Sequence, residues 1–577
     1  MTIYYQPVRG ERRREETMEK IRQETPVVET AYGPVRGTVE DSILAFRGIP
    51  YAAPPVGDRR FKAPEPPEPW TEPREATQFG PACPQEYSEL ELPEGLELPE
   101  GSPISEDCLT LNVWSRSLEG NDPVIVFIHG GGFVAGSASI PWYDGADLAR
   151  RGATVVSIQY RLGPFGWLDL SDLGPEYAQS MNNGLKDQMA ALQWVRQNIA
   201  AFGGDPRNVT VSGESAGAIS ISALMGAPEA DGLYDRAILQ SGTAGTVASR
   251  KWAAGVAKTF AKKARVKNLA EVLELSTEQM LRAASKLYSS SEFSDTVFHP
   301  VVDGGLIPEL PSARIASPDG PSTPVIIGTT LDEARYWYYP LPVIRRLPLV
   351  YSRPWLEALV SDRADEVIEA YRTERPDLTD SELQLAMIGD VGFRMPAIRM
   401  ADALSARGVE THMYLATVPT IDMDGALGSP HAVELPFVFG TTGAATTFVA
   451  DDAANRRLSE QVQDLWVSFA QGQTPTTAET TWTQYDEDTR STLIMDTDLR
   501  VESDPYPAAR QAWGELSFNG AEPGLEGLTP FQYAGTNTYD PRVIGAVIGW
   551  GRVCAAGAVL LGLAAGALLL GRRLWRG

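Results

Sequence analysis

The amino-acid sequence predicts an α/β fold in which a central, mostly parallel β-sheet is flanked by helices. Short apolar runs bounded by Gly, Pro, Asn or Asp alternate along the chain with longer segments of helical periodicity. This alternation is typical of βαβ units stacked into a parallel sheet. With 43% hydrophobic and 22% charged residues, the 577-residue chain also has the composition of a protein with a large packed core. We therefore expect one large globular domain.

The apolar runs are the predicted strands. We expect them at residues 122–129, 153–160, 208–212, 236–240, 324–328 and 411–417. One long helix is expected at residues 182–202, because its apolar side chains recur at spacings of three and four: Leu185, Met189, Leu192, Val195 and Ile199. The Gly-Gly-Asp-Pro sequence at 203–206 should end this helix and turn the chain into the next strand.

The net charge of −25 excludes a typical nucleic-acid-binding protein. Binding a polyanion requires clusters of Lys and Arg that displace its counterions, and no such cluster is evident. The acidic balance favours a role in solubility. Only three cysteines occur, which excludes a small disulfide scaffold; Cys83 and Cys108 are the one pair close in sequence, while Cys554 lies in an apolar C-terminal segment.

The two ends of the chain differ in character. Residues 1–25 are rich in charge and contain no apolar run, so we predict a disordered or loosely helical arm and no signal peptide. Residues 553–571 (VCAAGAVLLGLAAGALLLG) carry no charge, and such a helix would span the roughly 30 Å of a bilayer core. We predict a single transmembrane helix in the lipid bilayer at 553–571, after a linker at 518–552 and before a basic tail at 572–577.

The membrane side of the globular domain is left open by two conflicting signals. Arg572, Arg573 and Arg576 follow the predicted span, which favours a cytoplasmic tail and an exported domain. Export requires a signal, and the N-terminal sequence does not contain one. The alternatives are a tail-anchored protein with its large domain in the cytosol and delivery by another route.

Ser215 is the candidate nucleophile. It lies in Gly213-Glu214-Ser215-Ala216-Gly217, directly after the predicted strand 208–212 and before a predicted helix at 216–225. A strand, a sharp turn and a helix form the context that a Gly-x-Ser-x-Gly nucleophile elbow requires. The two glycines allow the tight turn and leave the serine hydroxyl above the sheet. An ordinary strand-to-helix turn would make no demand on the rest of the sequence, whereas a nucleophile requires three further features.

The first requirement is a set of donors for an oxyanion, because attack on an ester carbonyl develops negative charge on oxygen. The sequence His129-Gly130-Gly131-Gly132-Phe133 follows the predicted strand 122–129 and can supply backbone N–H groups. The N–H of Ala216, next to the nucleophile, is a further donor.

The second and third requirements are a base and an acid that orients it, in the chain order Ser, Asp or Glu, His. Of the three histidines after Ser215, His299 and His412 adjoin or lie in predicted strands, whereas His431 lies in a loop. A loop base on a rigid sheet is the usual arrangement, so His431 is the candidate. Asp332 and Glu333 both follow the strand 324–328, and spacing alone does not choose between them.

Several motifs together resemble the type-B carboxylesterase family, which has the α/β-hydrolase fold. They are residues 46–55 (FRGIPYAAPP), 105–113 (SEDCLTLNV), 160–166 (YRLGPFG), the glycine run, the Ser215 elbow and Pro430-His431. The resemblance extends from about Pro26 to about Trp513, and we assign residues 26–517 to a carboxylesterase catalytic domain. It implies a serine esterase that forms an acyl-serine intermediate, acts on a small-molecule ester and needs no metal or cofactor.

The resemblance also assigns roles to individual residues. Ser215, Glu333 and His431 match the family's catalytic triad, with Glu333 in the acid's place ahead of Asp332. Gly131, Gly132 and Ala216 match its oxyanion hole, and Cys83 with Cys108 matches its first disulfide. Cholinesterases carry a choline-binding tryptophan in that disulfide loop, whereas residues 84–107 here contain no Trp. The resemblance therefore implies a general esterase and not a cholinesterase.

Two other functions, a lipase and an adhesion protein, are compatible with this fold joined to a C-terminal membrane span. A lipase acting on membrane esters stays open because the predicted span would hold the site near lipid. A non-catalytic, neuroligin-like adhesion protein also combines this fold with a C-terminal span, but this chain keeps every catalytic residue and lacks a Ser/Thr-rich stalk.

The aromatic residues 336–339 (YWYY) either line the substrate site or pack in the core.

Overall fold

The computed structural model describes residues 25–85, 93, 95–288, 297–342, 344–346, 348–351 and 353–514. The predicted linker, membrane helix at 553–571 and basic tail lie outside these residues, as does the N-terminal arm except for its last residue. Within the described part of the chain, no helix is long and apolar enough to cross a membrane.

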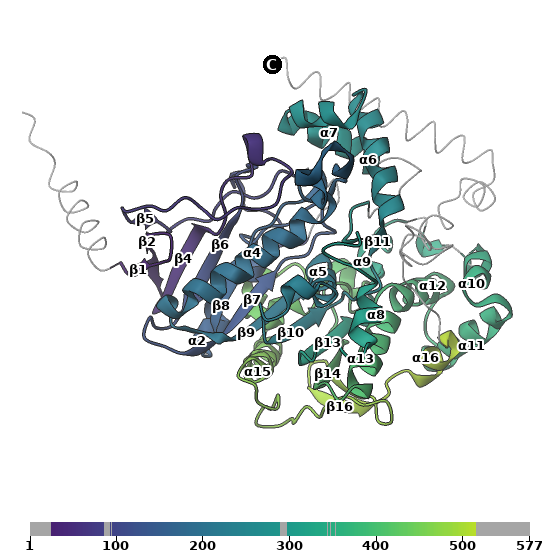
Figure 1. Ribbon diagram of the computed structural model, residues 1–577. Helices are drawn as coiled ribbons and strands as arrows, with labels where there is room; N and C mark the ends of the chain where they lie inside the picture. The colour runs from purple at the N-terminus through teal and green to yellow at the C-terminus, as the bar shows by residue number, and fades with distance from the viewer. Residues whose placement is uncertain are drawn as a thin grey trace, which may run out of the picture.

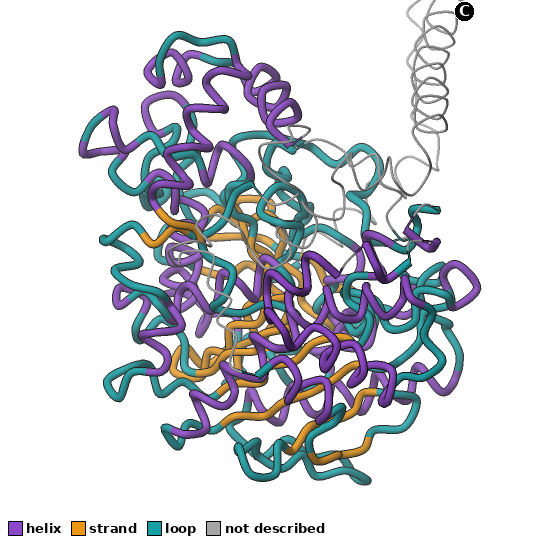
Figure 2. The backbone as a smooth tube through the Cα atoms, turned by 90° about the vertical axis from the view of Figure 1, so that its right-hand side faces the viewer, coloured by secondary structure: helices purple, strands orange, loops and turns teal. Residues whose placement is uncertain are grey.

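The predicted central sheet is present and mostly parallel. Over the described residues it has eleven strands (Figures 1 and 2). In spatial order they are β16 (Arg500–Ser503), β15 (Ser491–Met495), β14 (Thr411–Ala416), β13 (Val325–Thr330), β10 (Arg236–Gln240), β9 (Gly204–Glu214), β7 (Asp122–Ile128), β8 (Thr154–Ile158), β6 (Thr110–Ser115), β4 (Ile43–Pro50) and β3 (Thr38–Glu40). Neighbours from β15 to β8 pair in parallel, and antiparallel pairs lie only at the two ends.

Both faces of the sheet are buried, which explains why its strands are continuous apolar runs. In β7, Val124, Val126 and Ile128 face one core, whereas Ile125 and Phe127 face the other. The first core includes side chains of α4 (Asn183–Asn198), α5 (Ala216–Met225), α8 (Pro311–Ala316) and α13 (Met395–Ala406). The second includes side chains of α2 (Ala146–Arg150), α14 (Leu435–Phe439) and α15 (Ala453–Ala470). The result is a three-layer α/β/α arrangement (Figure 2).

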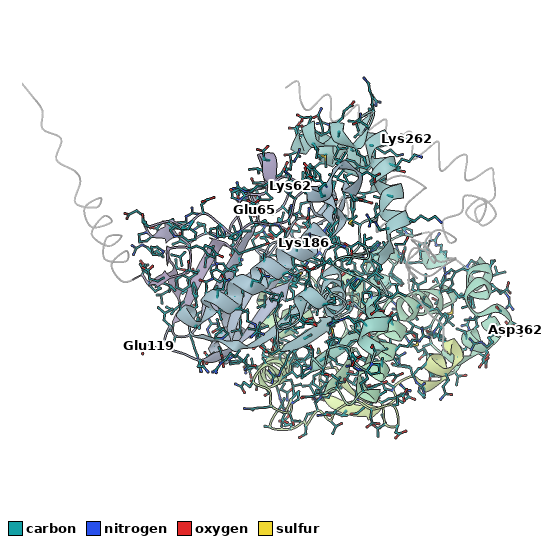
Figure 3. All side chains as sticks on the ribbon, in the orientation of Figure 1. Lys62, Glu65, Glu119, Lys186, Lys262 and Asp362 are labelled. Carbon is teal, nitrogen blue, oxygen red and sulfur yellow. The ribbon has the colours of Figure 1, made fainter. Side chains whose placement is uncertain are left out.

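The remaining elements surround this three-layer body. The other helices are α3 (Gly163–Trp167), α6 (Arg250–Ala264), α7 (Thr277–Tyr288), α9 (Arg335–Tyr338), α10 (Arg353–Val360), α11 (Ala364–Glu374), α12 (Asp380–Gly389) and α16 (Pro507–Trp513). Two small sheets are formed by β1 (Val27–Glu29), β2 (Pro34–Arg36) and β5 (Arg74–Glu75), and by β11 (Ala248–Ser249) with β12 (Val301–Val302). Charged side chains such as Glu119, Lys262 and Asp362 lie exposed at the periphery (Figure 3).

The predicted strands and the predicted long helix are all present, and their bounds differ by a few residues. The largest difference is in β9, which begins at Gly204 and not at residue 208, because Gly204 pairs with Asp122 of β7. The helix predicted at 182–202 is α4 followed by a 3₁₀ turn at Ile199–Phe202. It ends at Gly203, whose φ of 84° is a left-handed conformation that glycine adopts without strain.

The predicted disulfide requires a correction, because Cys83 and Cys108 are both free. They are neighbours in the first core, where each is almost fully buried. The Cys83 sulfur accepts a hydrogen bond from the backbone N–H of Leu162 at 3.1 Å. A hydrogen bond to Cys83, together with burial, raises the pKa of the Cys108 thiol well above its ordinary value. The structure therefore does not contain the predicted disulfide.

The order of the parallel strands brings the candidate site together. The glycine run follows β7, Ser215 follows β9, Glu333 follows β13 and the loop of His431 follows β14. Since these strands are parallel and near one another in the order β7-β9-β10-β13-β14, their carboxyl ends lie along one edge of the sheet. Ligands of open α/β sheets bind at this edge.

Candidate active site

Ser215 occupies a strained turn between β9 and α5. Its φ of 54° and ψ of −121° lie in a region that residues other than glycine rarely adopt. Its backbone N–H donates to the carbonyl of Gln240 at 2.8 Å, and its own carbonyl accepts from Ile219 at 2.9 Å. The turn therefore holds Ser215 at the N-terminus of a buried helix, with the residue itself partly exposed.

The two glycines of the elbow are required by close packing. A Cβ on Gly213 would lie 2.7 Å from the carbonyl carbon of Gly217, and a Cβ on Gly217 would lie 2.0 Å from the carbonyl oxygen of Ile128. Any side chain at Gly217 would push α5 away from β7. The Gly-x-Ser-x-Gly pattern thus reflects contact between the elbow and the neighbouring strand.

The glycine run after β7 lies against the elbow. A Cβ on Gly130 would lie 3.0 Å from the Cβ of Ser215. Gly131 and Gly132 have φ values of 104° and 60°, and a Cβ on Gly131 would meet the carbonyl of Ala135 at 2.1 Å. Within the described chain, no backbone hydrogen bond is donated by Gly131, Gly132 or Ala216. These three N–H groups are therefore available to an oxyanion near Ser215.

His431 and Glu333 form a buried pair. Nδ1 of His431 lies 2.5 Å from Oε2 of Glu333, and both side chains are almost completely inaccessible. The other oxygen of Glu333 accepts from the Thr330 N–H at 2.8 Å and the Ser241 hydroxyl at 2.6 Å. A carboxylate fixed in this way can orient the imidazole and stabilise its protonated form.

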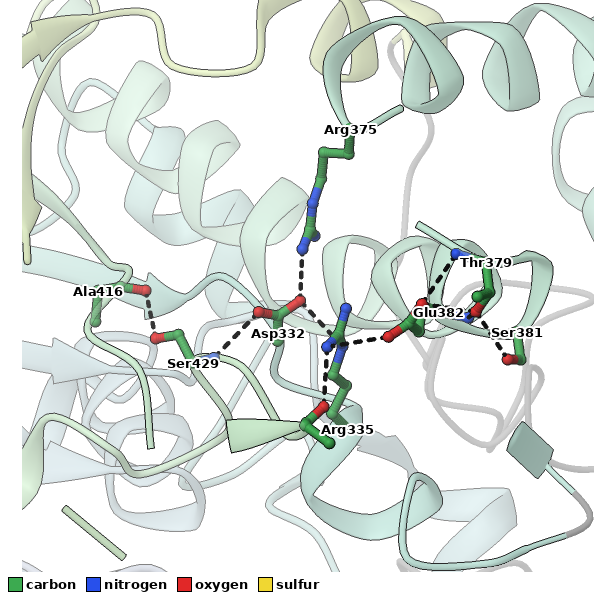
Figure 4. Close-up of polar contacts among 9 residues, drawn as sticks. Asp332, Arg335, Arg375, Thr379, Ser381, Glu382, Ala416 and Ser429 are labelled. Carbon is green, nitrogen blue, oxygen red and sulfur yellow. Dashed lines mark hydrogen bonds and ion pairs between the residues drawn. The ribbon is translucent and has the colours of Figure 1, made fainter. Parts of the chain in front are cut away.

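Asp332, the alternative acid, contacts other residues. Its carboxylate accepts from Arg375 at 2.7 Å and from the Ser429 N–H at 3.1 Å, and it pairs with Arg335 (Figure 4). The tertiary structure therefore brings Glu333, and not Asp332, to the imidazole.

Glu214 is a site residue that sequence reasoning did not single out. Its Oε1 lies 2.8 Å from Nε2 of His431, out of line for a hydrogen bond. Burial alone would lower the pKa of His431, but Glu214 and Glu333 together raise it well above its ordinary value. The only sequence signal for Glu214 was a charged residue inside the elbow, between a buried strand and the nucleophile.

Glu434 adds a third carboxyl group to the same buried region. It accepts from the Tyr414 hydroxyl at 3.0 Å and from Gln240 Nε2 at 3.3 Å. Burial and the nearby Glu214 and Glu333 raise its pKa to about 7. Glu434 was not singled out by the sequence patterns. No group of three or more His, Cys, Asp or Glu among the described residues is arranged to hold a metal ion.

Comparison with known proteins now identifies the family. A profile of the Carboxylesterase family matches residues 24–513.

The chain belongs to the carboxylesterase family.

This carboxylesterase is 39% identical to the para-nitrobenzyl esterase of Bacillus subtilis over 506 residues, covering 84% of this chain and 98% of that protein. It is 34% identical to the phenmedipham hydrolase of Pseudarthrobacter oxydans, covering 78% and 91% of the two chains. Among solved structures it resembles a thermophilic pNB esterase with a TM-score of 0.76 and 38% identity, over 84% of this chain and 99% of that chain. The predicted family and its α/β-hydrolase fold are confirmed, and the protein is a carboxylic ester hydrolase.

The aromatic cluster of the carboxylesterase is divided between the site and the core. The ring of Trp337 lies 4.6 Å from the His431 ring, and that of Tyr336 lies 6.2 Å away. Tyr338 is buried in the first core. Phe393 also contacts His431, at 5.2 Å, from a π-helical turn at Asp390–Arg394 between α12 and α13. Such turns often occur at functional sites, but nothing in the sequence around Phe393 predicted this one.

The other histidines of this carboxylesterase lie in structural positions. His412 is buried within β14 and lies 3.3 Å from Glu410. His299 packs edge-on against Phe133 with ring centroids 6.0 Å apart. His129 stacks on Tyr160, and burial lowers its pKa to about 4. The structure brings only His431 to the buried carboxylate Glu333.

Proposed function

We propose that the chain hydrolyses small carboxylic esters through an acyl-enzyme on Ser215, with His431 as general base and Glu333 as the carboxylate that orients it. The observation that carries the proposal is the buried 2.5 Å contact between His431 Nδ1 and Glu333 Oε2. Nε2 of the same ring lies 2.8 Å from Glu214, the residue directly before the strained Ser215 turn. Nucleophile, base and orienting acid come from three different strand ends, which is the arrangement of α/β-hydrolase triads.

The proposed reaction has two halves. The Ser215 oxygen attacks the ester carbonyl while its proton passes to Nε2 of His431, and the carbonyl electrons move onto the oxygen. The N–H groups of Gly131, Gly132 and Ala216 stabilise that oxyanion. As the tetrahedral intermediate collapses, the alkoxide leaves with the proton from His431 and an acyl-serine remains. Water then attacks the acyl group by the same route and releases the acid.

The protonation of His431 sets a condition on this reaction. A base must be neutral to accept a proton, and the carboxylates Glu214 and Glu333 favour the imidazolium. The same carboxylates stabilise the imidazolium that forms in the transition state. We therefore expect activity to fall in acid, as His431 becomes protonated in the free enzyme.

The substrate class we propose is an ester with an aryl or benzyl group. Trp337 and Phe393 form an aromatic wall against the His431 ring, at 4.6 and 5.2 Å. Aromatic rings next to the base suit an aromatic leaving group through edge-to-face or offset contact. The name of the relative from Bacillus subtilis, para-nitrobenzyl esterase, points to the same class.

Substitution of Ser215 tests the function. Ser215→Ala should reduce hydrolysis of p-nitrophenyl acetate by at least ~10³-fold. Ser222→Ala is the matched control, because Ser222 lies in the same helix and its hydroxyl bonds only to the Ile219 carbonyl. An organophosphonate probe should label wild type and Ser222→Ala but not Ser215→Ala. A Ser215→Ala enzyme with near wild-type activity would falsify the proposal, and absence of labelling in wild type would instead favour an adhesion protein.

We further propose that residues 553–571 anchor the enzyme in a bilayer. The support is the sequence alone, an uncharged apolar stretch followed by Arg572, Arg573 and Arg576. Full-length protein should remain in the membrane pellet after carbonate washing, and a chain ending at residue 552 should not. Equal solubility of the two would contradict the anchor. Protease protection in intact cells identifies the membrane side on which the catalytic domain lies. In a separate assay, a preference for esters with long acyl chains would favour a lipase.

A further inference from the structure

Asp332 connects the two loops that carry Glu333 and His431. Its backbone N–H donates to the Ser429 carbonyl at 2.9 Å, and its carboxylate accepts from the Ser429 N–H at 3.1 Å. Ser429 is two residues before His431, and Asp332 is one residue before Glu333. The Ser429 hydroxyl also donates to the Ala416 carbonyl at 2.8 Å, which ties the same loop to the end of β14.

The loop before His431 is packed directly onto the Asp332 carboxylate. Gly428 has a φ of 66°, and a Cβ at this position would lie 2.3 Å from Oδ2 of Asp332. Glycine is therefore required at 428 both by its conformation and by the approach of the carboxylate. This contact places the path of the His431 loop within a few ångströms of Asp332.

Two arginines hold the Asp332 carboxylate from its other side (Figure 4). Nη2 of Arg375 donates to Oδ1 at 2.7 Å, and Nε of Arg335 lies 3.3 Å from the same oxygen. Arg335 also donates to the Ala426 carbonyl at 3.0 Å, so it contacts the His431 loop directly. Asp332 is only 5% exposed, and these two arginines fix its carboxylate in place.

We propose that Asp332 is a positioning residue that sets the location of His431 relative to Glu333 and Ser215. This role of Asp332 rests on the proposed function, because it depends on His431 acting as the general base. Asp332 touches neither Ser215 nor the imidazole; it fixes the loop from which the imidazole projects. Its effect is therefore on the geometry of proton transfer and not on substrate contact.

The expected kinetic effect follows from this geometry. Displacement of a catalytic group by about 1 Å can cost roughly 100-fold in rate. Removing the carboxylate leaves the Ser429 N–H and two arginines without their partner, so the loop will shift. Because substrate contacts stay in place, kcat should fall much more than KM changes.

The test compares two substitutions at Asp332 with a matched control. Asp332→Ala should lower kcat for p-nitrophenyl acetate by about 10- to 100-fold with KM within about threefold. Asp332→Asn keeps an oxygen for the Ser429 N–H and should lie between Ala and wild type. The control is Asp402→Asn in α13, which loses a partly buried pair with Arg490. The side-chain partners of Asp402, Arg490 and Tyr485, belong to neither loop. Its kcat should stay within about twofold of wild type.

A second measurement separates this inference from the proposed function. The proton shared by His431 Nδ1 and Glu333 should give a low-field ¹H NMR signal in wild type and in Asp402→Asn, weakened or lost in Asp332→Ala. Loss of this signal in Asp332→Ala supports the positioning role of Asp332, even if the wild-type protein does not hydrolyse esters. In that case only the proposed function fails. An unchanged signal and kcat in a folded Asp332→Ala would overturn the inference, as would an equal loss in Asp402→Asn.

Discussion

Nε2 of His431 lies 2.8 Å from Oε1 of Glu214, while Nδ1 of the same ring lies 2.5 Å from Oε2 of Glu333. The imidazole is therefore held between two buried carboxylates. In the proposed mechanism Glu333 is the orienting acid, whereas Glu214 lies beside Nε2, the nitrogen proposed to accept the Ser215 proton. Glu214 thus raises the pKa of His431 by its charge, together with Glu333.

The first prediction concerns the pH dependence of activity. The raised pKa of His431 means that the base becomes protonated, and activity is lost, at a higher pH than for an ordinary histidine. Glu214→Gln removes one of the two carboxylates, so the acid limb of kcat/KM should move to lower pH by about one unit. Measurement of kcat/KM from pH 5 to 9 tests this. The control is Glu119→Gln, an exposed substitution far from the site, which should leave the acid limb of kcat/KM unchanged. If the acid limb did not shift in Glu214→Gln, Glu214 would not control the pKa of His431.

The second prediction concerns the pH dependence of stability. Glu434 has a pKa of about 7 in the folded chain against an ordinary value of 4.5. As pH rises between these values, the unfolded carboxyl loses its proton before the folded one, so wild type loses stability. Glu434→Gln stays neutral and keeps an oxygen for Tyr414, and should be more stable than wild type above pH 7 by up to about 3 kcal/mol.

Urea unfolding at pH 5 and pH 8 measures this difference. The advantage of Glu434→Gln should be small at pH 5 and largest at pH 8. An advantage that did not grow with pH would mean that Glu434 ionises normally in the folded protein.

The third prediction compares two glycines. Gly217→Ala would place a Cβ 2.0 Å from the Ile128 carbonyl and should destabilise the fold by about 3 kcal/mol or more. Gly255→Ala, in the exposed part of α6 with nothing within 4 Å of the new Cβ, should stabilise by about 0.5–1 kcal/mol. Thermal unfolding of both variants distinguishes a packed glycine from a free one. Equal effects would contradict the close contact between α5 and β7.

The fourth prediction compares a buried ion pair with an exposed one. Arg161 and Asp187 pair at 2.7 Å with side chains 3% and 0% exposed. Asp187→Ala would leave a buried guanidinium without its partner and should cost about 3–5 kcal/mol. Glu479 pairs with Arg457 at 2.6 Å, but both side chains are more than half exposed, so Glu479→Ala should cost less than about 1 kcal/mol. Chemical denaturation of the two variants should therefore give clearly different midpoints.

Local sequence patterns predicted the fold class and six of the eleven described strands of the central sheet, but not the strands at its two ends. The strands of the sheet are apolar runs, and their neighbours in the chain are helices with apolar faces, so each element is specified by residues within it. The elbow around Ser215 was also predictable, because a tight turn between a strand and a helix needs glycines at fixed spacing. Family resemblance added the class of enzyme, which the matching profile confirms.

The contacts of the site depend on residues far apart in the chain. Glu333 and His431 are separated by 98 positions, and spacing could not decide between Asp332 and Glu333. Only the packed structure shows one carboxylate turned toward the imidazole and the other toward Arg335 and Arg375. The unpaired state of Cys83 and Cys108 was likewise not visible in their spacing.

The sequence by itself therefore determined the middle strands of the sheet, the long helix α4 and the residue types that can react, because periodicity, turn chemistry and motif spacing are local properties. The tertiary structure decided which of those residues meet. The contacts of Glu214 with His431, of Phe393 with the same ring and of Asp332 with Ser429 arise where strand ends and helices pack together. Such contacts depend on the relative placement of whole elements, and no pattern within one element encodes that placement.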